Sequence, residues 1–250
     1  MEYLSVGIIS YLMGSIPFGF LLTKFFLKKD IREIGSGNIG ATNVLRTGRK
    51  DLALATLLLD SGKAGIAAVI FNLAFGNAFP AIGLFAGATA FLGHCYPVWL
   101  HFKGGKGVAT YAGLLIAAVW KVALFAAPCW LLIAFLTRRS SVAALTTAAL
   151  VPVVGWALNC SLNSVLILVA LSLLLFWRHR ANIRRILDGT EPRFGDKKKQ
   201  HEDRSNRDSA SATRTPRPFE KPQMHACIAP QRKRVQYMFL RLCDFSMIMV

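Results

Sequence analysis

Charged residues are scarce in this sequence, which has 250 residues and only 17% Asp, Glu, Lys and Arg. An ordinary soluble protein carries about a quarter charged residues. From position 52 to position 177 the charged residues are Asp60, Lys63, Lys103, Lys106, Lys121, Arg138 and Arg139. With 54% hydrophobic residues overall, this scarcity excludes an ordinary soluble domain. The net charge of +17 comes from basic clusters beside apolar runs, so we expect no nucleic-acid partner, which would require basic residues on a solvated face.

Paired cysteines are missing as well. The cysteines are Cys95, Cys129, Cys160, Cys227 and Cys243, and they form no CxxC pair. The spacing therefore indicates neither a zinc site nor a disulfide framework, and we expect small packing residues with no metal and no cofactor. The start, Met1-Glu2, has no basic n-region, so the first apolar run is expected to be a retained helix rather than a signal peptide.

Long apolar segments take up most of the first 177 residues. They run approximately over 3–22, 52–75, 79–100, 108–120, 122–136, 142–158 and 164–177. Because about 20 apolar residues cross a bilayer as a helix, the fold class is all-α, a polytopic membrane protein with about seven transmembrane helices. Only Lys121 separates the short fourth and fifth segments, so one long helix over 108–136 is the alternative.

The positions of the basic residues predict the orientation of the chain in the membrane. They gather in the first, third and fifth loops and directly after the last segment. Short loops rich in Lys and Arg stay in the cytoplasm. With seven spans, the N-terminus lies outside and the C-terminus lies in the cytoplasm, with the basic clusters on the cytoplasmic face.

The composition changes after about position 196. Residues 1–196 are expected to form a membrane-embedded domain, and residues 197–250 a basic, disordered cytoplasmic tail, because apolar periodicity disappears there. The tail is interpreted as a lineage-specific extension, a lipid contact through Arg232, Lys233 and Arg234, or an altered reading frame. We place no site there.

A glycine-rich loop follows the first apolar segment. Gly35 to Gly40 matches GxGxxG, but a dinucleotide site needs a preceding strand, and these flanks are membrane helices. Glycines can still turn backbone N–H groups toward an anion, and a helix starting near Ala41 would add its positive end. Ser36, Thr42 and Arg46 could bind a phosphate. A flexible glycine turn is the alternative.

Two further clusters lie beside apolar segments. In the first, Gly104-Gly105-Lys106-Gly107 favours exposed N–H groups and a cation converging on an anion, although a lysine at a helix end can also simply reach the interface. His94, just before it, is expected to be a packed or hydrogen-bonded histidine. In the second, a continuous helix would place Arg178, His179 and Asn182 on one face.

One opposite-charge pair lies inside an apolar segment. Asp60 and Lys63 are spaced i,i+3 in the second segment. Ionisable residues in a membrane are costly and usually face the protein interior. We expect a structural ion pair.

The three clusters together resemble the bacterial acyl-phosphate:glycerol-3-phosphate acyltransferase family, PlsY. The resemblance covers roughly residues 3–196. Its motifs are Gly35-Ser-Gly-Asn-Ile-Gly-Ala-Thr-Asn43 with Arg46, Gly93-His94 through Phe102-Lys-Gly-Gly-Lys-Gly-Val-Ala-Thr110, and Arg178-His-Arg-Ala-Asn-Ile183 with Gly189 and Glu191.

The resemblance implies that acyl phosphate and glycerol 3-phosphate react at the bacterial inner membrane, on its cytoplasmic face, to give lysophosphatidate for phospholipid synthesis. It implies no cofactor, and it leaves room for a partner enzyme that produces acyl phosphate. The implied catalytic residues are His179, Asn182, Ser36 and Lys106. The implied substrate and phosphate ligands are Ser36, Gly37, Asn38, Gly40, Thr42, Arg46, Gly104, Gly105, Lys106, Gly107, Thr110 and Ser141. Glu191 is the implied structural carboxylate.

Two further observations concern the acyl donor that the resemblance implies and the base, which stays open. The His-x4-Asp motif of CoA-dependent acyltransferases is absent after every histidine in the sequence. Without a residue that resembles a covalent acyl carrier, direct attack on the mixed anhydride is expected, with His179 or the substrate phosphate taking the proton. A transporter or binding protein for a phosphorylated solute is the alternative function.

Overall fold

The computed structural model describes residues 1–194, which form α-helices and short 3-10 helices and contain no strand. The all-α prediction is confirmed for this part of the chain. The tail predicted over residues 197–250 lies outside the described residues, as do Cys227 and Cys243. Cys95 is buried, and Cys129 and Cys160 are partly buried and free.

The helices follow the apolar segments of the sequence. The α-helices are α1 (Glu2–Ser15), α2 (Phe18–Leu27), α3 (Ala41–Val44), α4 (Lys50–Phe75), α5 (Ile82–Cys95), α6 (Val108–Ala118), α7 (Trp120–Thr137), α8 (Ser140–Ala157), α9 (Leu162–Arg178) and α10 (Arg180–Leu187). The 3-10 helices are η1 (Ile31–Glu33), η2 (Leu45–Thr47) and η3 (Val98–Leu100).

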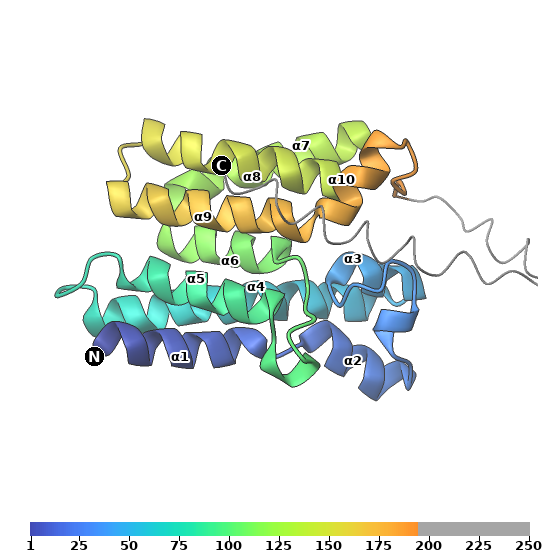
Figure 1. The fold of residues 1–250 in the computed structure, drawn as a ribbon, viewed down its shortest axis with the longest axis horizontal. Helices are drawn as coiled ribbons and strands as arrows, with labels where there is room; N and C mark the ends of the chain where they lie inside the picture. The colour runs from blue at the N-terminus through green and yellow to red at the C-terminus, as the bar shows by residue number, and fades with distance from the viewer. Residues whose placement is uncertain (195–250) are drawn as a thin grey trace, which may run out of the picture. The chain divides into compact units, whose positions relative to one another are not determined.

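The long helices run side by side within residues 1–194 (Figure 1). Helix α1 packs on α5, α4 packs on α5 and α6, and α8 lies between α7 and α9. The connections that follow α2, α5, α7 and α9 lie in the right-hand half of the bundle in Figure 1, toward α3 and α10. Three of these connections and α10 hold the basic clusters of the sequence, and the fourth, after α7, holds Arg138 and Arg139.

Length and composition qualify four helical stretches as membrane spans: α1 with α2, α4, α7 and α8. A fifth is formed if the bent pair α9 and α10 is taken as one span. Helices α5 and α6, with 14 and 11 residues, coincide with the third and fourth apolar segments but are shorter than a full crossing. A sharp turn at Val119 separates α6 from α7, so the alternative of one long helix over 108–136 is wrong.

The first apolar segment is broken rather than continuous. Helix α1 ends at Ser15, Ile16 adopts an extended conformation, and α2 begins at Phe18. Pro17 explains the break, because proline donates no backbone hydrogen bond and disfavours helical geometry at the residue before it. At the break the Ile16 carbonyl oxygen accepts from the Phe18 N–H at 3.1 Å, and Lys63 Nζ also donates to it at 3.0 Å.

Small residues allow the helices to approach closely. A Cβ on Gly14 would lie 2.0 Å from the Ala90 carbonyl oxygen of α5, and one on Gly113 would lie 1.9 Å from the Ser61 oxygen of α4. Such contacts drive helix association in membranes, where lipid removes the hydrophobic drive for helices to associate. They surround a core that includes Phe91, Leu114 and Leu168.

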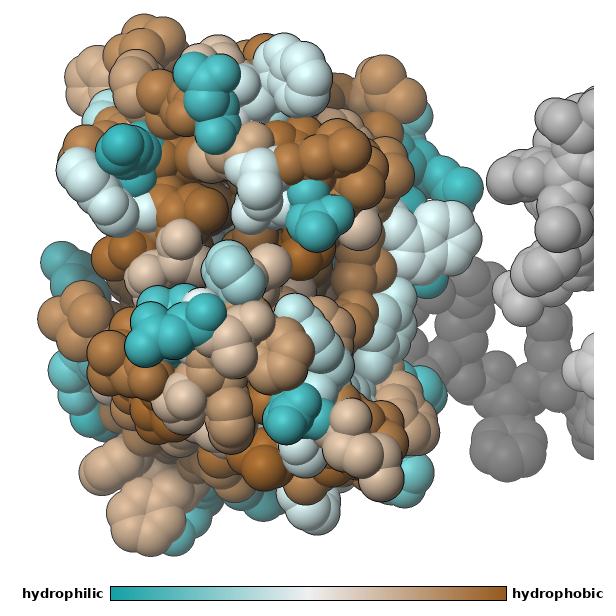
Figure 2. Space-filling view, turned by 90° about the vertical axis from the view of Figure 1, so that its left-hand side faces the viewer, coloured by the Kyte–Doolittle hydropathy of each residue, from teal (hydrophilic) through white to brown (hydrophobic). Residues whose placement is uncertain are grey.

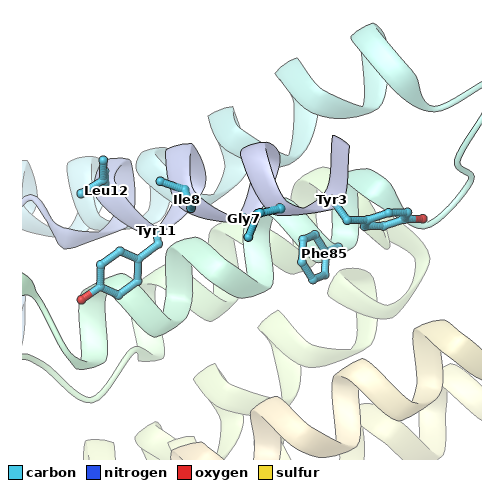
Figure 3. Close-up of a pocket in the computed structure, with 7 residues that line it drawn as sticks. Tyr3, Gly7, Ile8, Tyr11, Leu12 and Phe85 are labelled. Carbon is cyan, nitrogen blue, oxygen red and sulfur yellow. The ribbon is translucent and has the colours of Figure 1, made fainter. Parts of the chain in front are cut away.

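Large apolar side chains cover the outside of the bundle. Leu73 and Phe135, for example, are 80% and 81% exposed. Figure 2 views the end opposite the basic connections, where apolar residues predominate and hydrophilic ones occur singly or in small groups. An open hollow of about 660 Å³ lies along α1, between Tyr3 and Leu12, with Phe85 of α5 beside it (Figure 3). None of its lining residues belongs to the three motifs.

The contact between α4 and α6 predicts a position-specific effect of adding one methyl group. Gly113→Ala is expected to destabilise the protein by about 1–3 kcal/mol, because the Ser61 backbone cannot move away without separating the helices. Gly62→Ala is the matched control, since its nearest neighbour would be Ile66 Cδ1 at 3.8 Å. Thermal unfolding in detergent measures both, and equal melting temperatures for the two variants would contradict the packing argument.

Candidate functional site

A buried asparagine organises the first motif. Asn43 Nδ2 donates to the carbonyl oxygens of Ile31, Ile34 and Asn38, and its Oδ1 accepts from the Ser36 N–H at 3.0 Å. One side chain that is 1% exposed therefore ties four parts of the loop together. Gly35 and Gly37 adopt positive φ angles of 59° and 70° between these contacts, which glycine permits at no steric cost.

The predicted residues of this motif lie around that framework. Ser36, Gly37, Thr42 and Arg46 are exposed, while Asn38 and Gly40 are partly buried. Helix α3 starts at Ala41, as expected, with Gly40 as its N-cap. Arg46 folds back over the loop, since a Cβ on Gly35 would lie 2.9 Å from Arg46 Cδ.

The second motif is a tightly packed turn at the end of α5. The N–H groups of Gly104 and Gly105 donate to the carbonyl oxygens of Cys95 and His94 at 3.2 and 3.0 Å. On the other side, Arg178 donates to the carbonyl oxygens of Gly104 and Gly105 at 2.8 and 3.0 Å. The expectation of exposed N–H groups therefore fails at these two glycines, whose backbone is committed to internal bonds.

Close approach explains why these positions are glycine. A Cβ on Gly104 would lie 2.2 Å from the His94 carbonyl oxygen, and one on Gly105 would lie 2.0 Å from His94 Nε2. Gly107, with φ of 84°, faces the Phe91 ring and is the N-cap of α6. The amides of Lys106 and Gly107 make no hydrogen bond within residues 1–194, so they are free to face an anion.

Lys106 lies where the three motifs meet. Burial lowers the pKa of its ammonium group to about 8, while the nearby Glu191 carboxylate acts in the opposite direction. The guanidinium groups of Arg185, Arg46 and Arg178 lower this pKa further. Thr110, in the first turn of α6, is fully buried, and its hydroxyl finds no partner in the described part of the chain.

His179 lies at a bend rather than inside a continuous helix. Helix α9 ends at Arg178, α10 begins at Arg180, and the two axes differ by 60°. The expectation that Arg178, His179 and Asn182 share one helix face is therefore wrong. The bend sends Arg178 to the Gly104–Gly105 turn and Asn182 toward Glu191.

The His179 ring is 2% exposed and has a defined tautomer. Its Nδ1 lies 2.8 Å from the Leu175 carbonyl oxygen, which can only accept, so Nδ1 carries the proton and Nε2 keeps its lone pair. Burial lowers the pKa of His179 to about 4, with a further contribution from the positive charge of Lys106. The imidazole is neutral at pH 7.

Glu191 orients the side chains around it. Asn182 Nδ2 donates to Glu191 Oε1 at 2.7 Å, and Arg185 Nε donates to Oε2 at 2.8 Å. Because the carboxylate takes the amide nitrogen of Asn182, the amide oxygen points away from it, is buried, and has no donor within residues 1–194. Although burial acts in the opposite direction, the Ser141 hydroxyl, Asn182 and Arg185 together lower the pKa of the Glu191 carboxyl.

The structure thus brings together Lys106, Ser141, His179, Asn182 and Glu191 with the arginines of the first and third motifs, and Thr110 lies one helical turn after Lys106. The hydroxyls of Ser36 and Thr42 make no contact with this group in the described part of the chain. The same part contains no group of three His, Cys, Asp or Glu residues that could hold a metal ion.

Comparison with known proteins identifies the family. Residues 4–189 match the model of the family described as glycerol-3-phosphate acyltransferase. The chain belongs to the glycerol-3-phosphate acyltransferase family. It is 56% identical over 200 residues to the glycerol-3-phosphate acyltransferase of Hyphomonas neptunium, covering 79% of this chain and 95% of the relative. It is 52% identical over 205 residues to that of Caulobacter vibrioides, covering 81% and 94%.

Solved structures of the family share the fold. A crystal structure of PlsY, described as an integral membrane glycerol 3-phosphate acyltransferase in its glycerol 3-phosphate form, matches with a TM-score of 0.74 and 38% identity, over 78% of this chain and 96% of that one. The lysophosphatidic acid form of PlsY matches with a TM-score of 0.71. The resemblance to this acyltransferase family is confirmed.

Two residues with structural contacts near the motifs had no role assigned from the sequence. Asn43 was visible in the first motif, and asparagine is common in turns because its side chain bonds nearby backbone. Arg138 gave no such signal. Its Nη2 donates to the Phe194 carbonyl oxygen at 2.7 Å, and Phe194 N–H donates back to the Arg138 carbonyl at 2.6 Å. This clamp fastens the chain just after Glu191 to the connection before α8.

The hydrogen bonds of Glu191 predict a pH-dependent contribution to stability. A carboxyl whose pKa is lowered on folding stabilises the folded state above its ordinary value of 4.5, and this contribution is lost as the pH falls through the lowered value. Glu191→Gln is therefore expected to melt below the wild type at pH 7, with a difference that shrinks on acidification below about pH 4.5. Thermal unfolding across this range measures it.

The exposed Glu33 supplies the control for this titration. Glu33→Gln is expected to leave the melting temperature unchanged across the same pH range. A difference between wild type and Glu191→Gln that stays constant from pH 7 down to the acid limit would contradict the assignment.

Proposed function

We propose that this acyltransferase moves a fatty acyl group from acyl phosphate to the 1-hydroxyl of glycerol 3-phosphate, producing lysophosphatidate and inorganic phosphate. The observation that carries the proposal is the meeting of the Lys106 ammonium, the neutral His179 and the unpartnered Asn182 oxygen among several arginines. The related structures carry glycerol 3-phosphate and lysophosphatidic acid in their descriptions, which supports this acceptor and this product.

The cations define where the phosphate groups would bind. Lys106, with the free amides at the start of α6, would hold the phosphate of glycerol 3-phosphate, since the positive end of a helix and a nearby ammonium both favour an anion. Arg46, with Ser36, Gly37, Asn38, Gly40 and Thr42 of the exposed first loop, would hold the other. An arriving anion favours the charged form of Lys106 and would raise its pKa above the value of the empty site.

Asn182 and His179 would orient the glycerol. Asn182 presents a buried acceptor oxygen, fixed by Glu191, and His179 presents a second acceptor at Nε2. A hydroxyl group can donate to either atom, and leaving a buried acceptor unpaired costs about 1–3 kcal/mol. Ser141 and Thr110 add hydroxyls at the beginning of α8 and α6.

The substrate phosphate, rather than His179, is the base in this proposal. The second pKa of a phosphate monoester is about 6, whereas burial lowers that of His179 to about 4. A free phosphate monoester is therefore a stronger base than His179 in the empty site. The hydroxyl oxygen forms a bond to the acyl carbon, the bond from that carbon to the phosphate oxygen breaks, the proton passes to the phosphate of glycerol 3-phosphate, and inorganic phosphate leaves.

We also propose that residues 1–196 form the enzyme and cross the bacterial inner membrane seven times, with the N-terminus outside and the site in the cytoplasm. The grouping of basic connections at one end of the bundle supports this orientation. Helix α5 is too short to span about 30 Å alone, but most of its residues are buried by neighbouring helices, so it need not match the lipid. The donor requires a partner enzyme that makes acyl phosphate.

The choice of donor decides the proposal. Purified protein in lipid or detergent, given palmitoyl phosphate and labelled glycerol 3-phosphate, is expected to form lysophosphatidate. Palmitoyl-CoA is expected to be a poor donor under the same conditions. Lys106→Ala is the matched negative control. Absence of product from palmitoyl phosphate, or a preference for palmitoyl-CoA, would overturn the proposal.

A pH profile tests the role of His179. In His179→Gln, which keeps a polar side chain of similar reach, kcat is expected to fall by less than the factor of about 10²–10⁴ that a general base supplies. The acidic limb of the rate profile is expected at the same pH in both proteins, at or below about pH 6, since it reports a phosphate whose pKa the nearby cations lower. A larger fall together with a displaced acidic limb would make His179 the base.

A further inference from the structure

A buried ionic cluster joins α4 to the end of α5, outside the site described above. Asp60, Lys63 and His94 are 2%, 5% and 3% exposed. Lys63 Nζ lies 3.0 Å from Asp60 Oδ1 and 2.9 Å from His94 Nδ1, and it donates to the Ile16 carbonyl oxygen at 3.0 Å. The predicted ion pair of Asp60 and Lys63 is present, and His94 joins it to form a cluster of three residues.

Charge in the membrane interior is costly unless it is paired and hydrogen-bonded. The ammonium of Lys63 adds a second donor to the Ile16 carbonyl oxygen, beside the Phe18 N–H, and that bond does not require His94. A neutral apolar pair would also be a cheaper way to pack α4 against α5. The cluster therefore holds a further group in place besides the two helices, and the His94 ring is that group.

Lys63 favours one tautomer of the His94 ring. Two members of the cluster lie close to His94 Nδ1: the Lys63 ammonium at 2.9 Å, which can only donate, and Asp60 Oδ1 at 3.5 Å, which can only accept. The shorter contact favours an Nδ1 that accepts from Lys63 and an Nε2 that carries the proton. The Nε2 edge of the ring lies against Gly105, where a Cβ would be 2.0 Å from Nε2 and 2.7 Å from Cε1. The ring is therefore held by Lys63 on one side and fills the space under the Gly104–Gly107 turn on the other.

The backbone of the same residue holds the turn as well. The His94 carbonyl oxygen accepts from the Gly105 N–H at 3.0 Å, and the neighbouring Cys95 carbonyl accepts from Gly104. Arg178 closes the opposite side of the turn. Lys106 follows Gly105 directly. Its position therefore depends on the contact between the turn and the His94 ring.

We propose that Asp60, Lys63 and His94 are positioning residues for glycerol phosphate binding: the cluster fixes the His94 ring, the ring fixes the Gly104–Gly105 turn, and the turn places Lys106. This inference rests on the proposed role of Lys106 as a phosphate ligand. None of the three residues touches the substrate. Because displacement of a substrate ligand by about 1 Å can cost as much as a hundredfold, a buried cluster one residue away is sufficient to control affinity.

His94→Asn tests the ring separately from the ionic cluster. The asparagine oxygen can still accept from Lys63, so the charges stay paired, while the ring that supports Gly105 is lost. The KM for glycerol 3-phosphate is expected to rise about tenfold or more, with kcat and the KM for palmitoyl phosphate close to wild type. His101→Asn is the matched control, because His101 is exposed in the same connection, and it is expected to leave all three constants unchanged.

Hydrogen exchange of the Gly104 and Gly105 amides separates this inference from the proposed function. Faster exchange in His94→Asn than in wild type is expected whether or not acyl phosphate is the donor. If the wild type forms no product yet the exchange is faster, the function fails and the support of the turn by His94 stands. If the wild type is active while exchange and KM are unchanged in His94→Asn, or if kcat and both KM values change together with the melting temperature, the positioning role is overturned.

A double-variant cycle checks the contact itself and does not depend on the folding of His94→Asn. Gly105→Ala, which would push against the ring, is expected to raise the KM for glycerol 3-phosphate in the wild type. In His94→Ala the space of the ring is open, so the same substitution is expected to cost less there. Equal costs in the two backgrounds would contradict the proposal, since independent sites are additive.

Discussion

The absence of water from the interior of a bilayer is the constraint on which this structure depends. Every backbone and side-chain polar group at that depth must find its partner within the protein. Helices satisfy the backbone, and several polar side chains inside the bundle bond to nearby groups, as Thr56 does to the Leu52 carbonyl. Most of the cations are consequently gathered at one end, where the connections between helices lie together.

Broken helices at that end create the site. Proline breaks the first span at Ile16, α5 ends in the turn before Lys106, and α9 bends by 60° at His179. Each break frees backbone groups or redirects side chains. Lys63 donates to a carbonyl at the first break, Arg178 takes up two carbonyls of the second, and Glu191 collects Asn182 and Arg185 beyond the third. The bonds from Arg178 therefore also join the second motif to the third.

Glycine has two separate uses in this protein. Gly35, Gly37 and Gly107 adopt positive φ angles that other residues rarely tolerate. Gly104, Gly105 and Gly113 instead provide room, because a Cβ at any of them would overlap the backbone or ring of another segment. The sequence pattern suggested anion-binding amides throughout. Two of the glycines in the second motif have their N–H groups bonded to the end of α5, so their contribution is to bring the turn close to His94.

By itself, the sequence determined the class of fold, the helical segments, the ion pair of Asp60 and Lys63, and the family. Apolar length and charge spacing are local properties that the bilayer converts directly into helices, and three separate motifs make chance resemblance improbable. Only the tertiary structure decided the break at Ile16, the bend at His179, the addition of His94 to the ion pair, and the clamp from Arg138 to Phe194. These depend on which side chains meet from distant segments, and neither periodicity nor composition carries that information.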